Sequence, residues 1–390
     1  MSTSKLLSKI TLNNNVEIPN RLVIAPMGLL CSNPDGSMSS EEREFLKIRA
    51  TGIGLYILGA SAISKEGIFK SNLSLIMSEK DIPALKERAD LIKSQGAKAI
   101  MQIFHAGAHA SREITGLSAF VPSSDIAIKD VEKKGGNYNK DLDFHELNDE
   151  EIKILIEKFA YATELCIKSG YDGVEIHGAN NYLIQQFYSP HTNKRSDLWG
   201  GNDNNRMNFP LKIVEAICKV REKYACPKFI IGYRLSPEEP YEDGLTMTET
   251  LKLIRALIKY PLQYIHISQK DYFKKARRGE GAGVERLRLI HEETKGKVAL
   301  IGVGGLKSQD DLISASNSEF SEFIGVAIAS MLNKDFGILL NEGKGDKLNL
   351  ELDPNHPEKY SIPSTLWKMC LQGYGWAPPL KGKSHKMQEN

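Results

Sequence analysis

The chain has 390 residues, of which 41% are hydrophobic and 26% are charged, and its formal net charge is only +2. This length and composition suit a globular protein with one large α/β barrel or two medium domains. The near-neutral charge gives no reason to expect a nucleic-acid or membrane partner. No apolar run reaches the roughly 18 residues that a membrane helix needs. The segment Met1–Lys9 lacks the apolar core of a secretory signal, so we expect a cytoplasmic protein.

The cysteine pattern also favours a cytoplasmic protein. Five cysteines are scattered without a CxxC pair, at Cys31, Cys166, Cys218, Cys226 and Cys370. This spacing argues against a structural zinc ion, an iron–sulfur cluster and a disulfide framework. We therefore expect a reducing compartment and no metal site.

Short apolar segments alternate with amphipathic stretches along most of the chain. The expected strands are Leu22–Ala25, Leu55–Leu58, Ala99–Phe104, Gly173–Ile176, Phe229–Tyr233, Tyr264–Ile267, Val298–Ile301 and Glu322–Val326. Their composition is typical of parallel strands buried on both faces. The expected helices are Ser40–Thr51, Ile82–Gln95, Asp149–Ser169, Asn204–Tyr224, Thr246–Lys259, Val284–Thr294 and Gln309–Ser316. Repeated strand–helix units of this kind predict an α/β fold, the (β/α)8 or TIM barrel.

Three segments lie outside this repeat. Leu6–Asn20 has the pattern of a small hairpin, which we expect to close the floor of the barrel. The polar segment 112–148 follows the third strand, so we expect it to form a lid over the active face. Residues 1–345 are predicted to form the barrel domain, and residues 346–390 a C-terminal extension that packs on it.

The C-terminal ends of barrel strands hold the reacting groups in enzymes with this fold, so the residues there are candidates. These positions carry Pro26, Met27, Gly28, Ala60, Gln102, His177 and Arg234. The seventh strand runs into Gly302–Gly305, and glycines there let the backbone approach an anion while the following helix points its amides at it. A tight loop would also explain these glycines, but their position after strand seven favours a phosphate site.

His177, Asn180 and Tyr182 form the sharpest constellation in the sequence. His177 and Asn180 are three residues apart, so on a helical turn both would project to the same side and could donate to one oxygen anion. The Tyr182 phenol could supply a proton. Each residue alone could simply pack, but together at one strand end they indicate catalysis.

These residues belong to longer motifs through which the sequence resembles the old yellow enzyme family of flavin oxidoreductases, particularly its bacterial NADH-dependent branch. The motifs are Asn20–Met27, Gln102–Gly107, Asp172–Ala179, Tyr182–Phe187 and Arg195–Gly201.

The resemblance implies FMN at the barrel mouth and NADH or NADPH as electron donor. Hydride would pass from N5 of reduced FMN to an activated alkene or a similar small electrophilic substrate. Flavin contacts are implied for Pro26, Met27, Gly28, Ala60, Gln102 and Arg234, and phosphate contacts for Gly304 and Gly305. His177 and Asn180 would hold the substrate oxygen, and Tyr182 would donate the proton.

Three places depart from the family pattern. Gly28 stands where many relatives have Thr or Cys, and Ala327–Ile328 stands where a Gly-Arg pair usually grips the phosphate. Lys307 and the loop Lys274–Arg278 are the candidate substitutes for that arginine. Tyr374 replaces an Arg that reaches a neighbouring subunit in some relatives, so the sequence leaves a homo-oligomer open.

Two other classes compete with this interpretation. A metal-dependent or Schiff-base lyase would favour a lysine at a strand end, and no expected strand ends in one. A non-catalytic flavin-binding protein would need no proton donor such as Tyr182. The acceptor stays open among enones, dienoyl thioesters, nitro compounds, quinones and oxygen, as does the choice between NADH and NADPH.

Overall fold

The computed structural model describes residues 3–124 and 143–382. Eight parallel strands close into a barrel, and each pairs with its neighbours in chain order until the last returns to the first. They are β3 (Leu22–Ile24), β4 (Leu55–Ala62), β5 (Lys98–Phe104), β8 (Gly173–Gly178), β9 (Ile230–Leu235), β10 (Tyr264–Ile267), β11 (Ala299–Val303) and β12 (Phe323–Val326). The predicted TIM barrel is confirmed.

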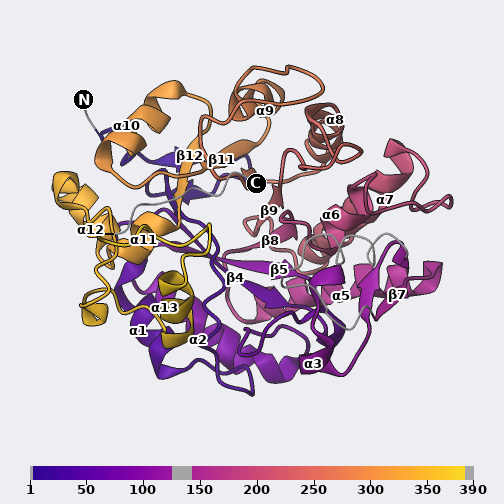
Figure 1. The fold of residues 1–390 in the computed structure, drawn as a ribbon, viewed down its shortest axis with the longest axis horizontal. Helices are drawn as coiled ribbons and strands as arrows, with labels where there is room; N and C mark the ends of the chain where they lie inside the picture. Colours follow the sequence, from indigo (N-terminus) through magenta and orange to yellow (C-terminus); the bar gives the residue numbers. More distant parts are fainter. Residues whose placement is uncertain (1–2, 125–142, 383–390) are drawn as a thin grey trace.

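Helices surround the strands, as Figure 1 shows. The seven predicted ones are α1 (Ser40–Arg49), α2 (Ile82–Lys93), α5 (Asp149–Lys168), α7 (Asp203–Lys223), α8 (Met247–Leu257), α9 (Arg286–Thr294) and α10 (Gln309–Ser318). Asn148, Thr246 and Ser308 begin α5, α8 and α10 with capping boxes, in which side chains satisfy the first helical amides. Two short helices that the sequence analysis did not predict follow β12, namely α11 (Ile328–Leu332) and α12 (Phe336–Asn341). Among the described residues, no helix is long and apolar enough to cross a membrane.

The barrel interior is filled by side chains at alternate strand positions. Val23, Ile57, Ile230 and Phe323 belong to one buried cluster there. The opposite sides of the same strands pack against the helices, so the strands are buried on both faces. This double burial explains why the strand sequences do not alternate between apolar and polar residues.

The N-terminal hairpin closes the bottom of the barrel. Its antiparallel strands are β1 (Ile10–Thr11) and β2 (Glu17–Ile18). Val16 and Ile18 are buried and pack with the interior cluster. The Asn13 side-chain amide donates hydrogen bonds to the carbonyl oxygens of Leu262 (2.7 Å) and Lys297 (2.9 Å), which precede β10 and β11. The predicted floor is therefore present.

The expected lid, 112–148, includes residues 125–142, which lie outside the described residues. Its described parts hold α3 (Arg112–Thr115) and the parallel pair β6 (Ala119–Val121) and β7 (Phe144–Glu146). Phe120 stacks on His105, just after β5, with ring centroids 5.8 Å apart. Arg195 donates to the carbonyl oxygens of Pro122 and Leu147 and so fixes both ends of this insertion. A lid function stays a prediction.

The segment after Lys347 returns to α1 and includes helix α13 (Ser364–Leu371). Tyr360, Leu366 and Cys370 are buried in the main hydrophobic cluster. The buried Arg49 guanidinium donates to the carbonyl oxygens of Phe45, Ser330 and Tyr360. The division of the chain at residue 345 stays a prediction.

The remaining described elements are α6 (Leu183–Tyr188) and the 3₁₀ turns η1 (Lys65–Gly67), η2 (Glu79–Asp81), η3 (Gly107–His109), η4 (Gly345–Lys347) and η5 (Pro357–Lys359).

Candidate active site

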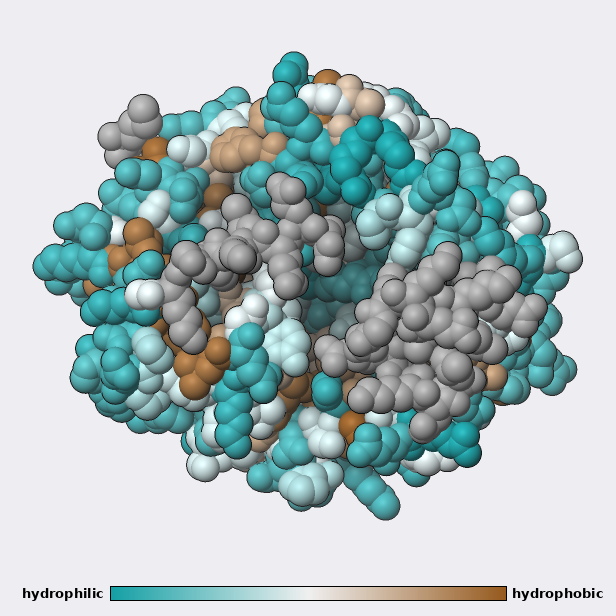
Figure 2. All heavy atoms as spheres, in the orientation of Figure 1, coloured by the Kyte–Doolittle hydropathy of each residue, from teal (hydrophilic) through white to brown (hydrophobic). Residues whose placement is uncertain are grey.

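Polar side chains gather at the C-terminal ends of three adjacent strands. His177 on β8 and His266 on β10 both stand in register with Arg234 on β9. Tyr264 and Ile230 belong to the barrel-interior cluster, so His266 and Arg234, two and four residues further on, point into the same space. The face drawn in Figure 2 is hollowed beside the labels β5, β8 and β9 of Figure 1, and hydrophilic residues line the hollow.

Arg234 is a buried cation with unused donors. Only 8% of the residue is exposed, and its Nε is buried without a hydrogen-bond partner in the described part of the chain. Burial lowers the pKa of Arg234, and the Glu175 carboxylate offsets part of this effect. Because a guanidinium with so high an ordinary pKa stays protonated, the site presents a fixed positive charge to a ligand.

His177 and Tyr182 lie against each other, with ring centroids 5.0 Å apart and planes at 85°. The Ala179 amide donates to Nδ1 of His177 (3.3 Å), which places the proton of a neutral imidazole on Nε2. Burial, Arg234 and His266 together lower the pKa of His177 well below its ordinary value. Burial raises the pKa of Tyr182 to about 12. At neutral pH the site therefore holds a neutral imidazole and a protonated phenol.

The chain at Asn180 does not form the helical turn that we expected after β8. Asn180 and Asn181 both have a φ of 58°, so the link between β8 and α6 is a left-handed turn and the predicted helical turn was wrong. The Asn180 amide N–H donates to Ser236 Oγ (2.9 Å), and its side-chain oxygen accepts from Ser268 Oγ (2.7 Å). These contacts hold Asn180 over the ends of β9 and β10 with its side-chain NH₂ still able to donate. A shared substrate oxygen with His177 stays a prediction.

Three of the residues expected to line a flavin ring meet on the other side of the barrel mouth. Met27 and Gly28 follow β3, Ala60 lies in β4, and all three line one small cavity of about 20 Å³. A Cβ atom added to Gly28 would meet only a Leu30 side-chain carbon at 3.9 Å. Packing therefore does not demand a glycine at position 28.

The glycine loop after β11, where a phosphate site is expected, has open amides. The amides of Gly304, Gly305 and Leu306 donate to no residue in the described ranges. Gly304 is also needed for packing, because a Cβ there would lie 2.5 Å from the Tyr272 nitrogen. Just before α10, the amides of Lys307 and Ser308 donate to the Asp311 carboxylate (3.0 and 2.9 Å), and the Asp311 amide donates to Ser308 Oγ (3.1 Å). A phosphate contact with the other first-turn amides of α10, those of Gln309 and Asp310, stays a prediction.

The structure also narrows the choice of a phosphate-binding cation. Arg277 and Arg278 donate to the carbonyl oxygens of Glu239 and Glu242, so their guanidinium groups are engaged elsewhere. Lys275 pairs with Glu285 at 3.9 Å. Lys307, in the loop between β11 and α10, and Lys274 make no side-chain ion pair with any described residue, so these two lysines stay candidates.

Sequence comparison agrees with this geometry. Residues 5–346 match the model of the NADH:flavin oxidoreductase / NADH oxidase family. The chain belongs to this family. It is 37% identical over 374 residues to a probable NADH-dependent flavin oxidoreductase, YqiG, of Bacillus subtilis, covering 96% of this chain and 97% of that protein. It is also 34% identical over 373 residues to the NADH:fumarate oxidoreductase of Klebsiella pneumoniae, covering 95% of this chain but 39% of the relative.

A solved structure shows the same fold. The old yellow enzyme of a Pichia species superposes with a TM-score of 0.71 at 21% identity, over 87% of each chain. By its sequence family this protein is an oxidoreductase that uses a flavin and a nicotinamide donor, and its fold is that of an old yellow enzyme. The unused donors of Arg234 and of the Gly304–Leu306 amides fit an anionic flavin nucleotide, because each would otherwise leave a polar group unsatisfied.

Sequence reasoning missed two residues of this oxidoreductase's site. Glu175, fully buried on β8, accepts from Gln102 Nε2 (2.7 Å) and pairs with His266 Nδ1 (2.9 Å). Burial raises the pKa of Glu175, but His266 and Arg234 outweigh this effect and lower it overall. The Nε2 atom of His266 is buried with no partner in the described ranges. The carboxylate thus fixes Gln102 and His266 beneath the mouth.

Proposed function

We propose that this oxidoreductase uses FMN and a nicotinamide donor to reduce an activated alkene, with Tyr182 as the proton donor. The observation that carries the proposal is the contact between His177 and Tyr182 beside Arg234. A neutral imidazole N–H donor, a protonated phenol and a fixed cation converge at the barrel mouth. A protein that only stores a flavin would need neither the imidazole donor nor the protonated phenol.

FMN, when bound, supplies the hydride that the acceptor takes up. His177 Nε2–H and the Asn180 side-chain amide donate to the acceptor's carbonyl or nitro oxygen, where negative charge grows in the transition state. The Tyr182 hydroxyl gives its proton to the α-carbon and regains one from solvent. Arg234 balances negative charge on the cofactor.

FMN rather than FAD suits the loop at Gly302–Gly305, which offers amides for one terminal phosphate. Lys307 is the cation that we assign to that phosphate. Releasing the cofactor by heat and separating it by chromatography tests the assignment. Recovery of FAD alone would contradict it. A Lys307→Met variant should bind FMN more weakly than wild type but bind riboflavin, which lacks the phosphate, equally well.

The decisive variant for the mechanism is Tyr182→Phe, which keeps the ring contacts and removes only the hydroxyl. Alkene reduction should slow by roughly 10²–10⁴-fold, because the α-carbon loses its general acid. Flavin reduction by NADH should stay within a few-fold, since that step takes no proton from the protein. Quinone reduction should also be spared, because solvent can protonate the acceptor's oxygens. Anaerobic stopped-flow measurement of each half-reaction separates these effects.

Tyr171→Phe is the matched control. The Tyr171 hydroxyl is buried without a partner among the described residues, and Tyr171 precedes β8, so it lies at the other end of the barrel. The Tyr171→Phe substitution should leave both half-reactions unchanged. Equal slowing of both half-reactions in Tyr182→Phe would indicate a packing role, and no slowing with any enone would show that Tyr182 is not the acid.

A further inference from the structure

Glu175 is the single acidic residue on the eight barrel strands, which all lie in the described ranges, and it is fully buried. Each of its carboxylate oxygens accepts one hydrogen bond, Oε1 from Gln102 Nε2 (2.7 Å) and Oε2 from His266 Nδ1 (2.9 Å). The partner on β5 is its neighbour in register, whereas the partner on β10 lies across β9. Gly232 of β9 leaves room for the β10 side chains to reach β8, because a Cβ there would lie 2.1 Å from the Tyr264 ring. The carboxylate therefore links three strands inside the barrel.

The Glu175 carboxylate fixes which atoms its two partners keep free. It only accepts hydrogen bonds, so Gln102 must turn its NH₂ and His266 an N–H towards it. Burial lowers the pKa of His266, and the Glu175 charge offsets only part of this effect, so the ring is neutral at neutral pH. With the ring proton on Nδ1, the other nitrogen, Nε2, is an acceptor, as is Gln102 Oε1. The two hydrogen bonds thus leave two acceptor atoms.

Neither acceptor is used within the described parts of the chain. His266 Nε2 is buried without a partner there. Gln102 Oε1 accepts from no described residue, yet it is not among the enclosed unpartnered atoms, so it borders open space. Arg234 stands beside His266 in register and has an unpartnered Nε among the described residues. Two acceptors and a cationic donor are therefore available to a ligand at this level of the barrel.

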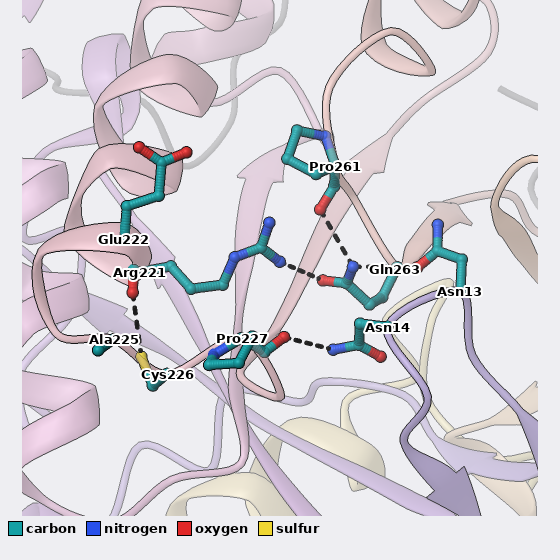
Figure 3. A pocket seen from close by; sticks show the side chains of 9 residues that line it. All are labelled: Asn13, Asn14, Arg221, Glu222, Ala225, Cys226, Pro227, Pro261 and Gln263. Atoms are coloured by element: carbon teal, nitrogen blue, oxygen red, sulfur yellow. Dashed lines mark hydrogen bonds between the residues drawn. The ribbon is translucent and has the colours of Figure 1, made fainter.

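A buried glutamine at the floor of the barrel provides a contrast. Gln263 lines the cavity drawn in Figure 3, where its Oε1 accepts from Arg221 Nη1 (3.0 Å). Its Nε2 donates to Asn13 Oδ1 and to the Pro261 carbonyl oxygen, both at 3.0 Å. The protein itself thus satisfies both ends of Gln263, whereas described residues satisfy only one end of Gln102. This difference singles out the mouth, rather than the floor, as the place prepared for a ligand.

The ring of a flavin presents a matching group. Its pyrimidine part has an imide edge, an N–H between two carbonyl oxygens, which needs an acceptor for the N–H and donors for the oxygens. We infer that Glu175 is a positioning residue for the flavin, which keeps an acceptor atom of Gln102 or His266 available to the imide N–H and makes the flavin harder to reduce. This inference rests on the proposed flavin site but not on the identity of the electron acceptor.

Glu175→Gln tests the positioning directly. A side-chain amide has one acceptor end and one donor end, so residue 175 can then serve only one of its partners as before. Either Gln102 turns its NH₂ to the open side or His266 moves its proton to Nε2, and in both cases a donor replaces an acceptor. The probes are FMN and 3-methyl-FMN, which lacks the imide N–H, each exchanged against the bound flavin of the loaded protein. Wild type should prefer FMN, and this preference should fall roughly three- to tenfold in the variant.

The flavin potential gives a readout that a merely structural role would not move. Reduced flavin carries negative charge, so loss of the Glu175 carboxylate should favour reduction. A tenfold shift of the reduction equilibrium corresponds to a rise of about 30 mV in the two-electron midpoint potential, which dye equilibration measures.

Glu175→Asp separates position from charge. It keeps the charge and both oxygens but withdraws them by one methylene group. The preference for FMN should therefore fall while the potential stays close to that of wild type. This variant decides the matter if Glu175→Gln does not fold.

Asp172→Asn is the matched control. Asp172 directly precedes β8, at the opposite end of that strand from the barrel mouth, where it accepts from the Ala99 amide (2.9 Å). Its replacement should change neither the preference nor the potential. An unchanged preference in either Glu175 variant, a lowered potential in Glu175→Gln, or equal affinity of wild type for the two flavins would each overturn the inference. Bleaching of the wild-type flavin by NADH tests the proposed function separately, so the failure of one can be told from the failure of the other.

Discussion

At the scale of single residues, burial sets the protonation states that the proposed chemistry needs. His177 stays neutral because water cannot reach its ring and because Arg234 and His266 disfavour a second positive charge. Tyr182 stays protonated because its phenolate would be buried. One effect, removal from water, thus prepares both a hydrogen-bond donor and a proton donor.

Replacement of His177 by Ala should weaken binding of a phenol and of an enone. The loss should be roughly 1.5–3 kcal/mol, which is the contribution of one charge-assisted hydrogen bond. Titration of the flavin spectrum with a phenol measures it, and flavin content should be unchanged. His145→Ala, which removes a histidine paired with Glu151 on the insertion, is the control. An unaltered phenol affinity in flavin-replete His177→Ala protein would exclude this role.

Replacement of Gly28 by Thr should be tolerated, because the site has room for a side chain. If the new hydroxyl donates to the flavin, as the family resemblance implies for this position, it should stabilise the reduced form. One hydrogen bond of about 0.5–1.5 kcal/mol corresponds to a rise of roughly 10–30 mV in the two-electron midpoint potential. Gly28→Val fills similar space without a hydroxyl and should not raise the potential. An equal shift in both variants would mean that shape, rather than hydrogen bonding, controls the flavin.

The sequence pointed to His177, Tyr182 and Arg234 because they sit at strand ends within motifs. It did not point to Glu175 and His266, although polar residues at alternate positions of β8 and β10 were a usable signal. Their partnership joins residues 91 apart in the chain, which no local pattern reveals.

At the scale of elements, the barrel strands and long helices were predictable because each has a strong apolar pattern. Helices α11 and α12 were not, since elements of five and six residues are too short to show a helical period. The self-capping of α10 was readable in principle, because Ser308 and Asp311 have the spacing of a capping box. That signal would have shown that the amides of Ser308 and Asp311 are already bonded within the capping box.

The hairpin is the element whose role is simplest to test. Ile18 is fully buried in the barrel interior, so Ile18→Ala should lower the free energy of unfolding by about 2–5 kcal/mol. Ile10, which is only partly buried on the same hairpin, is the matched control. Its replacement by Ala should lower the free energy of unfolding by less. Denaturant unfolding measures both, and flavin content of the folded protein should not change. Equal costs for the two variants would contradict the floor role.

At the scale of the whole molecule, buried histidines make stability depend on pH. Burial lowers the pKa of His105 to about 4, against an ordinary value of 6.5. Above pH 6.5 this residue is neutral in both folded and unfolded chains, so its contribution to stability is fully present. Between pH 6.5 and 4 the unfolded chain takes up the proton first, and roughly 3 kcal/mol of stability is lost.

His105→Gln should therefore show a shallower loss of unfolding free energy between pH 6.5 and 4 than wild type does. His356→Gln, at an exposed site, should follow the wild-type profile. Denaturant unfolding across this pH range provides the comparison. Parallel profiles for wild type and His105→Gln would show that His105 does not remain neutral in the folded protein.

The central claim is that the flavin takes electrons from a nicotinamide and passes them to an alkene at His177, Asn180 and Tyr182. The most direct measurement is an anaerobic cycle in which NADH or NADPH bleaches the bound flavin and an enone is then added. The account predicts that the flavin colour returns with formation of the saturated product, and that the return is slow in Tyr182→Phe while bleaching is not. Flavin that bleaches but is never reoxidised by any enone or nitroalkene, only by quinones or oxygen, would contradict the account.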